Sequence, residues 1–349
     1  MRPGGVSEGV PVFPFHLLPM VAVAVAGALV SGCSAPAELG ARDRALVAGR
    51  TYVVTGASSG FGRGVAEKLG TYGANVVLAA RRGAVLEEVA AQVRANGGQA
   101  LVVVTDVSDA AAVERLAQAA LDGFGAIDVW INDAAVASIG RFEEIPIADH
   151  VRMVDVNLKG VIFGSHVALR QFRRQGHGVL VNISSVEGSV PLAYHATYAA
   201  TKHALMGLDG AIREELRLGG LDRVIRVATI QPWAVDTPYW VHAGSYTGRL
   251  PQAGLLDGPR EVVDAILWNS VHPDGPYAVG WKARAAVLGD RVSPRLAERI
   301  GGAFIERTQM EQAPPGPITS GNLHQPMAEG TGVDGGLRAR MEAQERARR

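Results

Sequence analysis

The chain has 349 residues, of which 48% are hydrophobic and 19% are charged, and its formal net charge is zero. This length and composition are typical of a globular protein with a sizeable core, built as one large domain or two ordinary ones. The balanced charge excludes the strongly basic surface of a nucleic-acid-binding protein, and the single cysteine, Cys33, excludes an internal disulfide framework.

The N-terminal segment, residues 1–47, stands apart from the rest of the chain. Residues 14–30 are apolar and are followed by small residues and Cys33, an order that resembles a bacterial lipoprotein signal. The apolar stretch is short for a membrane-spanning helix, and prolines interrupt it. Three interpretations stay open: a signal or membrane anchor that ends at Cys33, a disordered extension, and a start codon placed too far upstream. Only residues 1–45 offer any contact with a membrane.

From residue 50 onward, short apolar segments alternate with segments of helical character. The elements predicted in chain order are a strand over 51–54, a helix over 63–72, a strand over 75–80, a helix over 84–95, a strand over 100–105, a helix capped by Ser108, a strand over 127–131, a long helix, a strand over 179–183, a helix from 198, a strand over 224–230, a helix over 261–269, a strand over 277–279 and a helix over 294–307. The long helix is expected to bury one face, formed by Val151, Val154, Leu158, Val161 and Ile162. Near-continuous apolar strands that alternate with helices predict a doubly wound α/β fold with a parallel sheet. Residues 312–349 are rich in Gly, Pro, Glu and Arg and are predicted to be disordered.

A glycine-rich turn, TGASSGFG, follows the first strand and opens the first helix. Glycines at such a turn let the backbone approach a pyrophosphate, and the helix N-terminus adds free N–H groups and a favourable dipole. The absence of a following Gly-Lys-Ser/Thr excludes a nucleoside-triphosphate loop. The residues expected to hold the cofactor here are Gly56, Ser58, Ser59, Gly60, Phe61 and Gly62.

The ends of the next strands carry further candidate cofactor residues. Arg81 and Arg82 end the second strand with no acid beside them, which favours the 2′-phosphate of NADP over NAD, although they could simply begin the next helix in solvent. Asp106 and Val107 follow the third strand and are placed for the adenine, with helix capping by Asp106 as the alternative. Asn132 and Ala134 follow the fourth strand, where the backbone can pass beside the cofactor.

Tyr198 and Lys202 are four residues apart on a predicted helix and therefore share one helical face. A nearby ammonium lowers the pKa of a phenol toward the range useful for acid–base catalysis. Ser185, at the end of a buried strand, could donate a hydrogen bond to a substrate oxygen. Asn157, an amide on a largely apolar helix, either bonds a neighbouring carbonyl or relays protons through water.

Taken together, the order TGxxxGxG, Asp-Val, an Asn-rich turn, VNLKG, NISS and YxxxK resembles the short-chain dehydrogenase/reductase family over residues 48–285. The resemblance implies a Rossmann-type fold of about seven strands with helices on both faces, and assembly as a homodimer or homotetramer. It implies that Tyr198 is the catalytic acid/base, that Lys202 binds the nicotinamide ribose and lowers the pKa of Tyr198, that Ser185 orients the substrate carbonyl, and that Asn157 holds a relay water. Residues 286–311 then form a C-terminal helical extension.

The sequence departs from the family pattern at two places. Asp133 and Ala135 stand in the Asn-Asn-Ala-Gly motif where the family has Asn and Gly, and Trp233 replaces the glycine that usually follows Pro232. Thr237 matches a residue that often bonds the nicotinamide amide in the family. The loop after the sixth strand is aromatic, which suggests an apolar substrate held by Trp233 and Tyr239, with Trp240 and Tyr246 nearby.

The prediction is an NADP-dependent oxidoreductase that interconverts a secondary alcohol and a ketone of a small, apolar molecule, without a metal ion. The alternative is a non-catalytic dinucleotide-binding or sensor protein on the same fold, which Asp133 and Trp233 favour. NADP is a cytoplasmic cofactor, so the domain is expected in the cytoplasm, with tethering through the segment ending at Cys33 left open.

Overall fold

The computed structural model describes residues 38–348, so the proposed signal or anchor ending at Cys33 lies outside the described residues. Within residues 38–348, no helix has both the length and the apolar character needed to cross a membrane. The folded domain begins earlier than residue 48, because helix α2 (Ala41–Val47) precedes the first strand and contributes the fully buried Val47 to the core.

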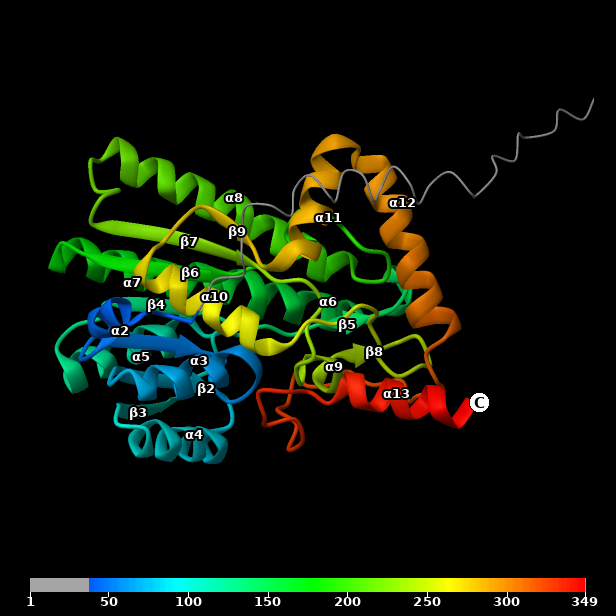
Figure 1. The fold of residues 1–349 in the computed structure, drawn as a ribbon, viewed down its shortest axis with the longest axis horizontal. Helices are drawn as coiled ribbons and strands as arrows, with labels where there is room; N and C mark the ends of the chain where they lie inside the picture. The colour runs from blue at the N-terminus through cyan, green and yellow to red at the C-terminus, as the bar shows by residue number, and fades with distance from the viewer. Residues whose placement is uncertain (1–37, 349) are drawn as a thin grey trace, which may run out of the picture. The chain divides into compact units, whose positions relative to one another are not determined.

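A seven-stranded parallel sheet forms the centre of the molecule (Figure 1). Its strands lie in the spatial order β3-β2-β1-β4-β6-β7-β9. They are β1 (Thr51–Thr55), β2 (Asn75–Ala80), β3 (Gln99–Val104), β4 (Val129–Asn132), β6 (Gly178–Ile183), β7 (Ile225–Gln231) and β9 (Pro276–Ala278). Every pair of neighbouring strands is parallel. The predicted Rossmann-type α/β fold is confirmed.

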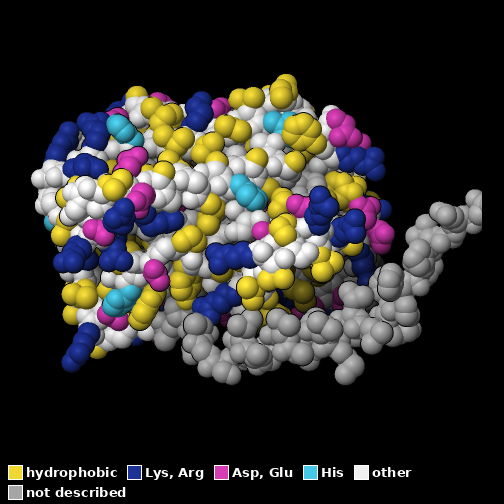
Figure 2. Space-filling view, turned by 90° about the horizontal axis from the view of Figure 1, so that it is seen from above, with side chains coloured by type: hydrophobic (Ala, Val, Ile, Leu, Met, Phe, Trp, Pro, Cys, Tyr) yellow, Lys and Arg dark blue, Asp and Glu magenta, His cyan; other side chains and the backbone are white. Residues whose placement is uncertain are grey.

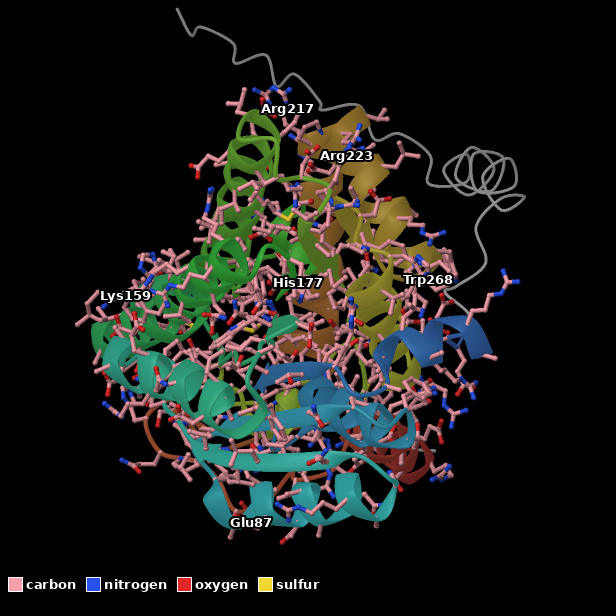
Figure 3. The ribbon with its side chains drawn as sticks, turned by 90° about the vertical axis from the view of Figure 1, so that its left-hand side faces the viewer. Glu87, Lys159, His177, Arg217, Arg223 and Trp268 are labelled. Carbon is pink, nitrogen blue, oxygen red and sulfur yellow. The ribbon has the colours of Figure 1, made fainter. Side chains whose placement is uncertain are left out.

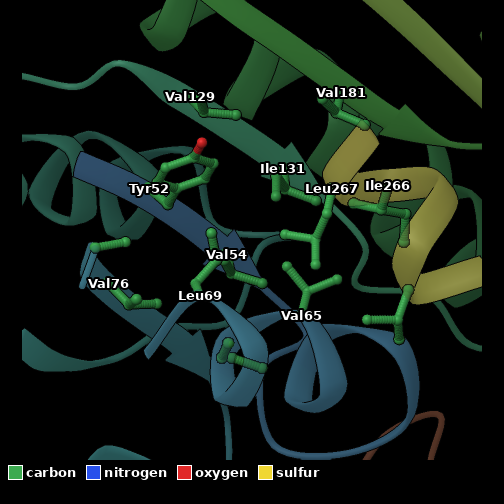
Figure 4. Close-up of a cluster of buried hydrophobic side chains, with 14 of the residues drawn as sticks. Tyr52, Val54, Val65, Leu69, Val76, Val129, Ile131, Val181, Ile266 and Leu267 are labelled. Atoms are coloured by element: carbon green, nitrogen blue, oxygen red, sulfur yellow. The ribbon is translucent and has the colours of Figure 1, made fainter. Parts of the chain in front are cut away.

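Helices cover both faces of this sheet. One face packs against α2, α3 (Gly60–Thr71), α4 (Gly83–Ala95) and α10 (Pro259–Val271), and the other against α5 (Ala110–Phe124), α7 (Gly160–Gln175) and α8 (Ala196–Leu218). In Figure 3, Lys159, just before α7, and Trp268 of α10 lie on opposite sides of the sheet. Each face of the sheet has its own hydrophobic core, and successive residues of β1 point into opposite cores. Tyr52 and Val54 belong to one core (Figure 4), and Val53 belongs to the other.

The long helix predicted before β6 is not a single α-helix. It consists of α6 (Ile147–Val154), a π-helical turn (Asp155–Lys159) and α7. Its predicted buried face is wrong at Val151 and Ile162, which are 53% and 40% exposed. The face of α6 that is buried carries Asp149, His150 and Met153 instead, and the π-helical turn changes the helical phase before α7.

Shorter elements complete the domain. They are β5 (Ser138–Ile139), paired with β8 (Gly244–Ser245), the 3₁₀ turns Phe142–Glu144 and Val186–Gly188, α9 (Tyr239–His242), α11 (Gly280–Val292), α12 (Pro294–Ile305), the π-helical turn Glu306–Glu311 and α13 (Leu337–Arg348). Asp109, not Ser108 as predicted, caps α5, because its carboxylate accepts the Ala111 N–H at 2.9 Å. On the face shown in Figure 2, basic and acidic side chains are interspersed.

The expectation that residues 312–349 are disordered is not met over residues 312–348. Leu323 and Leu337 are 0% and 1% exposed, and α13 lies beside α9 and β8 (Figure 1). Residues 319–336, which we call the C-terminal strap, run back along the domain. The strap is poor in apolar residues, and its backbone carbonyls accept hydrogen bonds from arginines of the domain, an interaction that composition does not reveal.

The buried Leu323 side chain should hold the C-terminal strap on the domain. Leu323→Ala is expected to lower the free energy of opening of residues 319–336 by about 2–5 kcal/mol, as for other buried Leu→Ala changes. Amide hydrogen exchange of the strap measures this opening. Ile318→Ala, at a side chain that is 69% exposed, is the matched control and should change it by less than about 0.5 kcal/mol. Fast exchange of the strap in the unmodified protein would contradict the docked arrangement.

Candidate active site

A cavity of about 430 Å³ lies at the carboxyl ends of the parallel strands. Strand order reverses between β1 and β4, and ligands of doubly wound sheets bind at such a switch point. The predicted site residues that line the cavity are Gly56, Ser58, Ser59, Gly60, Phe61, Arg81, Asp106, Val107, Ala134, Ser185, Tyr198, Lys202, Pro232, Trp233, Thr237 and Tyr239. Gly62, Asn132 and Asn157 are not part of its wall.

The glycine-rich turn packs closely against the loop after β4. Gly56 has a φ of +75°, and a Cβ atom there would lie 2.9 Å from the Ala134 nitrogen. A Cβ atom on Gly62 would lie 2.6 Å from the Gly56 carbonyl oxygen. Both positions therefore require glycine, and their packing leaves the turn open to the cavity. In the first turn of α3, the Gly60 N–H donates to the Gly332 carbonyl oxygen, whereas no described residue accepts from the Phe61 N–H.

Asp133 contacts the glycine-rich turn and interacts electrostatically with Lys202. Its carboxylate accepts the Gly62 N–H at 2.8 Å and lines the cavity. Burial raises the pKa of Asp133 to about 7, while the Lys202 ammonium and the Gly62 N–H act in the opposite direction. The departure from the family pattern at this position therefore adds a group that titrates near neutral pH.

Asn132, predicted as a cofactor residue, serves a buried polar network instead. Its side-chain oxygen accepts the Trp130 indole N–H, and its NH₂ group donates to Asn182, each at 2.8 Å. Asn182 donates in turn to Asp209 at 2.6 Å. Because these partners satisfy the Asn132 amide inside the core, its side chain does not reach the cavity.

The Asn157 amide is paired with one residue of the loop after β4. It accepts the Val136 N–H and donates to the Val136 carbonyl oxygen, both at 2.8 Å, from within the π-helical turn. Val136 lines the cavity, so this two-point contact fixes part of the cavity wall. The geometry favours the structural interpretation of Asn157, and the relay water stays a prediction.

Tyr198, Lys202 and Ser185 converge on the cavity, as their sequence spacing predicts. All three are buried, and the Lys202 ammonium nitrogen lies 5.6 Å from the centroid of the Tyr198 ring. Lys202 also donates to the Ile183 carbonyl oxygen at 2.7 Å, which holds the ammonium at the end of β6. Burial lowers the pKa of Lys202 to about 8, although Asp133 and Glu187 act against this shift.

The surroundings of Tyr198 raise the pKa of its phenol. Burial, followed by the negative charge of Glu187, raises the pKa of this phenol, and hydrogen bonding with Ser185 and Tyr239 offsets the shift only in part. Lys202 is not among the groups that lower the pKa of Tyr198 in this structure. The effect of Lys202 on the pKa of Tyr198 stays a prediction, and desolvation of the phenol is the largest cause of the shift.

A buried pair that the sequence reading missed, Glu187 and His195, lies beside the phenol. The Glu187 Oε1 atom is 2.9 Å from His195 Nδ1, and Oε2 has no hydrogen-bond partner within residues 38–348. Burial alone would lower the pKa of His195, but the charge and hydrogen bond of Glu187 raise it. The pair could have been suspected from its position, two residues after Ser185 and three before Tyr198.

Apolar side chains line the end of the cavity near Tyr198. Trp233 contributes to this wall, and its indole N–H donates to the Leu255 carbonyl oxygen at 3.1 Å. Tyr239 packs edge-on against Tyr198 with ring centroids 5.8 Å apart. The helical extension contributes further lining residues, which are Ile300, Gly301, Phe304 and Ile305. No feature of the sequence indicated that α12 would form part of the site.

At the other end, basic side chains meet the C-terminal strap. Arg81 donates to the carbonyl oxygens of Asn322, Leu323 and His324. Arg82 donates to Ser58 and to strap carbonyls, those of Met327, Glu329 and Gly330. Neither guanidinium has a carboxylate partner among the described residues. Asp106, expected to meet the adenine, instead pairs with Arg152 at 2.6 Å.

Comparison with known proteins agrees with this geometry. A family model described as short chain dehydrogenase matches residues 50–245. The chain is 36% identical over 230 residues to 3beta-hydroxysteroid dehydrogenase 1 of Eggerthella lenta, covering 63% of this chain and 86% of that protein.

Two solved structures share the fold. One is an alcohol dehydrogenase from the archaeon Thermococcus sibiricus complexed with 5-hydroxy-NADP, with 25% identity, a TM-score of 0.57, and coverage of 66% of this chain and 94% of that chain. The other is a 3-ketoacyl-(acyl-carrier-protein) reductase from Brucella melitensis complexed with NADH, with 27% identity, a TM-score of 0.58, and coverage of 67% and 97%.

The chain therefore belongs to the short-chain dehydrogenase family and is an oxidoreductase that acts on hydroxyl or keto groups with a nicotinamide dinucleotide. The residues present fit such a cofactor, because the Phe61 N–H in the first turn of α3 has no acceptor among the described residues and can meet a phosphate. The comparisons give no support to a non-catalytic sensor.

The raised pKa of Asp133 should make stability depend on pH. Between about 3.8 and about 7 the folded protein keeps a proton that the unfolded chain loses, so the free energy of unfolding falls as the pH rises through this window. Asp133→Asn should remove that part of the decrease, roughly 4 kcal/mol for a shift of about three pKa units. Denaturant unfolding from pH 4 to pH 8 measures it, with the exposed Asp222→Asn as control. Parallel pH profiles of the variant and the unmodified protein would contradict the assignment.

Proposed function

We propose that this short-chain dehydrogenase uses NADP(H) to interconvert a secondary alcohol and a ketone, with Tyr198 as the general acid/base. The observation that carries the proposal is the convergence of Tyr198, Lys202 and Ser185 on one cavity with the glycine-rich turn. The proposal also places the working domain in the cytoplasm, as a homodimer or homotetramer of the kind that the family resemblance implies.

The dinucleotide, when bound, supplies the hydride that reduces the carbonyl carbon. The Tyr198 hydroxyl gives its proton to the carbonyl oxygen, and the Ser185 hydroxyl donates a hydrogen bond to the same oxygen. Burial and Glu187 hold the pKa of Tyr198 above its usual value, so the phenol carries its proton at neutral pH. In the reduction direction, Tyr198 acts as the acid.

Charge at the far end of the cavity supports NADP over NAD. Arg81 and Arg82 lie side by side without carboxylate partners, and the charge of Arg81 is among the causes that lower the pKa of Arg82, after burial. A 2′-phosphate would relieve this repulsion and offer strong charge-assisted acceptors. The end of β2 has no acid to bond the ribose 2′-hydroxyl of NAD.

The walls near Tyr198 support a bulky, apolar substrate. Leu192, Trp233, Phe304 and Ile305 line that end of the cavity. The relative from Eggerthella lenta is named for a hydroxysteroid, a secondary alcohol on an apolar ring system. We therefore propose ring ketones and ring alcohols as the first substrates to test.

Removing the Tyr198 hydroxyl should abolish turnover without preventing cofactor binding. Tyr198→Phe is expected to lower kcat for ketone reduction by about 10²–10⁴-fold, the usual contribution of general acid catalysis. Loss of NADPH absorbance over a panel of ring ketones measures the rate, and calorimetry measures NADPH binding, which should be retained. Tyr72→Phe, at a buried tyrosine outside the cavity, is the matched control. Full turnover by Tyr198→Phe would refute the proposed mechanism.

Loss of the Arg81 guanidinium should weaken the binding of NADPH more than the binding of NADH. Arg81→Ala is expected to raise KM for NADPH by about tenfold or more, because a charge-assisted contact of 1.5–3 kcal/mol is lost. KM for NADH should change less, since NADH has no 2′-phosphate. Arg94→Ala, an exposed arginine on α4, is the control. An equal rise in KM for both cofactors would mean that Arg81 only holds the C-terminal strap, and it would remove the basis for an NADP preference.

A further inference from the structure

The C-terminal strap forms part of the wall of the cofactor cavity. Asn322, Pro326 and Met327 line the cavity at the end that holds Arg81, Arg82 and Asp106. This part of the chain lies beyond residues 50–245, which match the family model. The strap thus lies outside the part of the chain that the family model matches, at the place where the adenosine half of a dinucleotide is expected.

The part of the strap around Asn322 is firmly held. The next residue, Leu323, is fully buried, and its carbonyl oxygen accepts from Arg81 at 3.1 Å and from Arg152 at 2.9 Å. The Asn322 carbonyl oxygen accepts from Arg81 at 2.5 Å. Since backbone atoms make these contacts, the Asn322 side chain is left free for another partner.

The Asn322 side-chain oxygen has no such partner. Oδ1 is buried and accepts no hydrogen bond from any residue that the structure describes, although Asn322 lines the cavity. A buried acceptor without a hydrogen-bond partner destabilises the protein. A ligand that brings an N–H donor to this place would remove that destabilisation.

Asp106, the acceptor expected to meet the adenine, is already engaged. Its Oδ1 accepts from the Ser108 N–H at 3.0 Å and from the Ser108 hydroxyl at 2.7 Å, and its Oδ2 accepts from Arg152 at 2.6 Å. Arg152 also donates to the Leu323 carbonyl oxygen, so its guanidinium joins Asp106 to the residue that follows Asn322. The wall therefore offers a different acceptor, the Asn322 amide, near the position expected for the adenine amino group.

We propose that Asn322 binds the adenine of the cofactor and that the C-terminal strap completes the adenosine half of the cofactor site. An asparagine amide matches adenine, because its oxygen accepts from the amino group while its NH₂ group donates to a ring nitrogen. This inference rests on the proposed function, since it concerns the same NADP site. The ligand class is an adenine nucleotide that carries a 2′-phosphate.

The test compares a ligand that contains the adenosine half of the cofactor with a ligand that lacks it. Calorimetry measures the Kd of adenosine 2′,5′-bisphosphate and of reduced nicotinamide mononucleotide. Asn322→Leu should weaken binding of the bisphosphate by about tenfold, because a hydrogen bond is lost and the adenine amino group is left unpaired. Binding of the mononucleotide should not change. Gln325→Leu, at an exposed position of the same strap, is the matched control and should bind both ligands normally.

The outcomes separate this inference from the proposed function. If the unmodified protein binds neither NADPH nor the bisphosphate, the proposed function fails and this inference falls with it. If it binds both and Asn322→Leu binds them equally well, only the role of Asn322 is overturned.

A second measurement does not depend on how the variant folds. In the unmodified protein, the bisphosphate should slow amide exchange over residues 319–336, and the mononucleotide should not. Unchanged exchange in the presence of bound bisphosphate would overturn the assignment of the strap to the cofactor site.

Discussion

The parallel arrangement of the central sheet determines where the chemistry of this protein can occur. Parallel strands bring all their carboxyl ends to one edge, and the reversal of order between β1 and β4 opens a crevice there. The glycine-rich turn after β1, the arginines after β2 and Ser185 after β6 meet at this edge although they are far apart in the sequence. The close contact of Gly56 with Ala134 then fixes the distance between the two halves of the crevice.

Burial is the main determinant of which groups in this crevice are charged. Tyr198, Lys202 and Asp133 each have a pKa shifted toward the neutral form, because removal from water disfavours the charged form of each group. Glu187 adds a negative charge that opposes ionisation of the phenol and supports the protonated form of His195. The site thus holds its proton on Tyr198 until a substrate and a cofactor change the surroundings.

Local patterns were enough to predict the sheet, the glycine-rich turn and the convergence of Tyr198 with Lys202, because each depends on residue spacing within one element. The core position of the Asn132 side chain could not be predicted, since Trp130 and Asn182 hold it through hydrogen bonds that the sequence does not show. The pKa of Tyr198 depends on desolvation, which spacing does not reveal. The strap was mistaken for disordered chain because carbonyl oxygens, present in any sequence, hold it to Arg81 and Arg82.

The central claim is that this cavity carries out hydride transfer to a carbonyl carbon. The most direct test is a single-turnover reaction of the purified protein with NADPH deuterated at C4 of the nicotinamide and a panel of ring ketones, followed by mass spectrometry of the products. The account predicts an alcohol product with deuterium on the carbinol carbon. Binding of the dinucleotide without deuterium in any product would contradict it and would favour a protein that binds the cofactor without turnover.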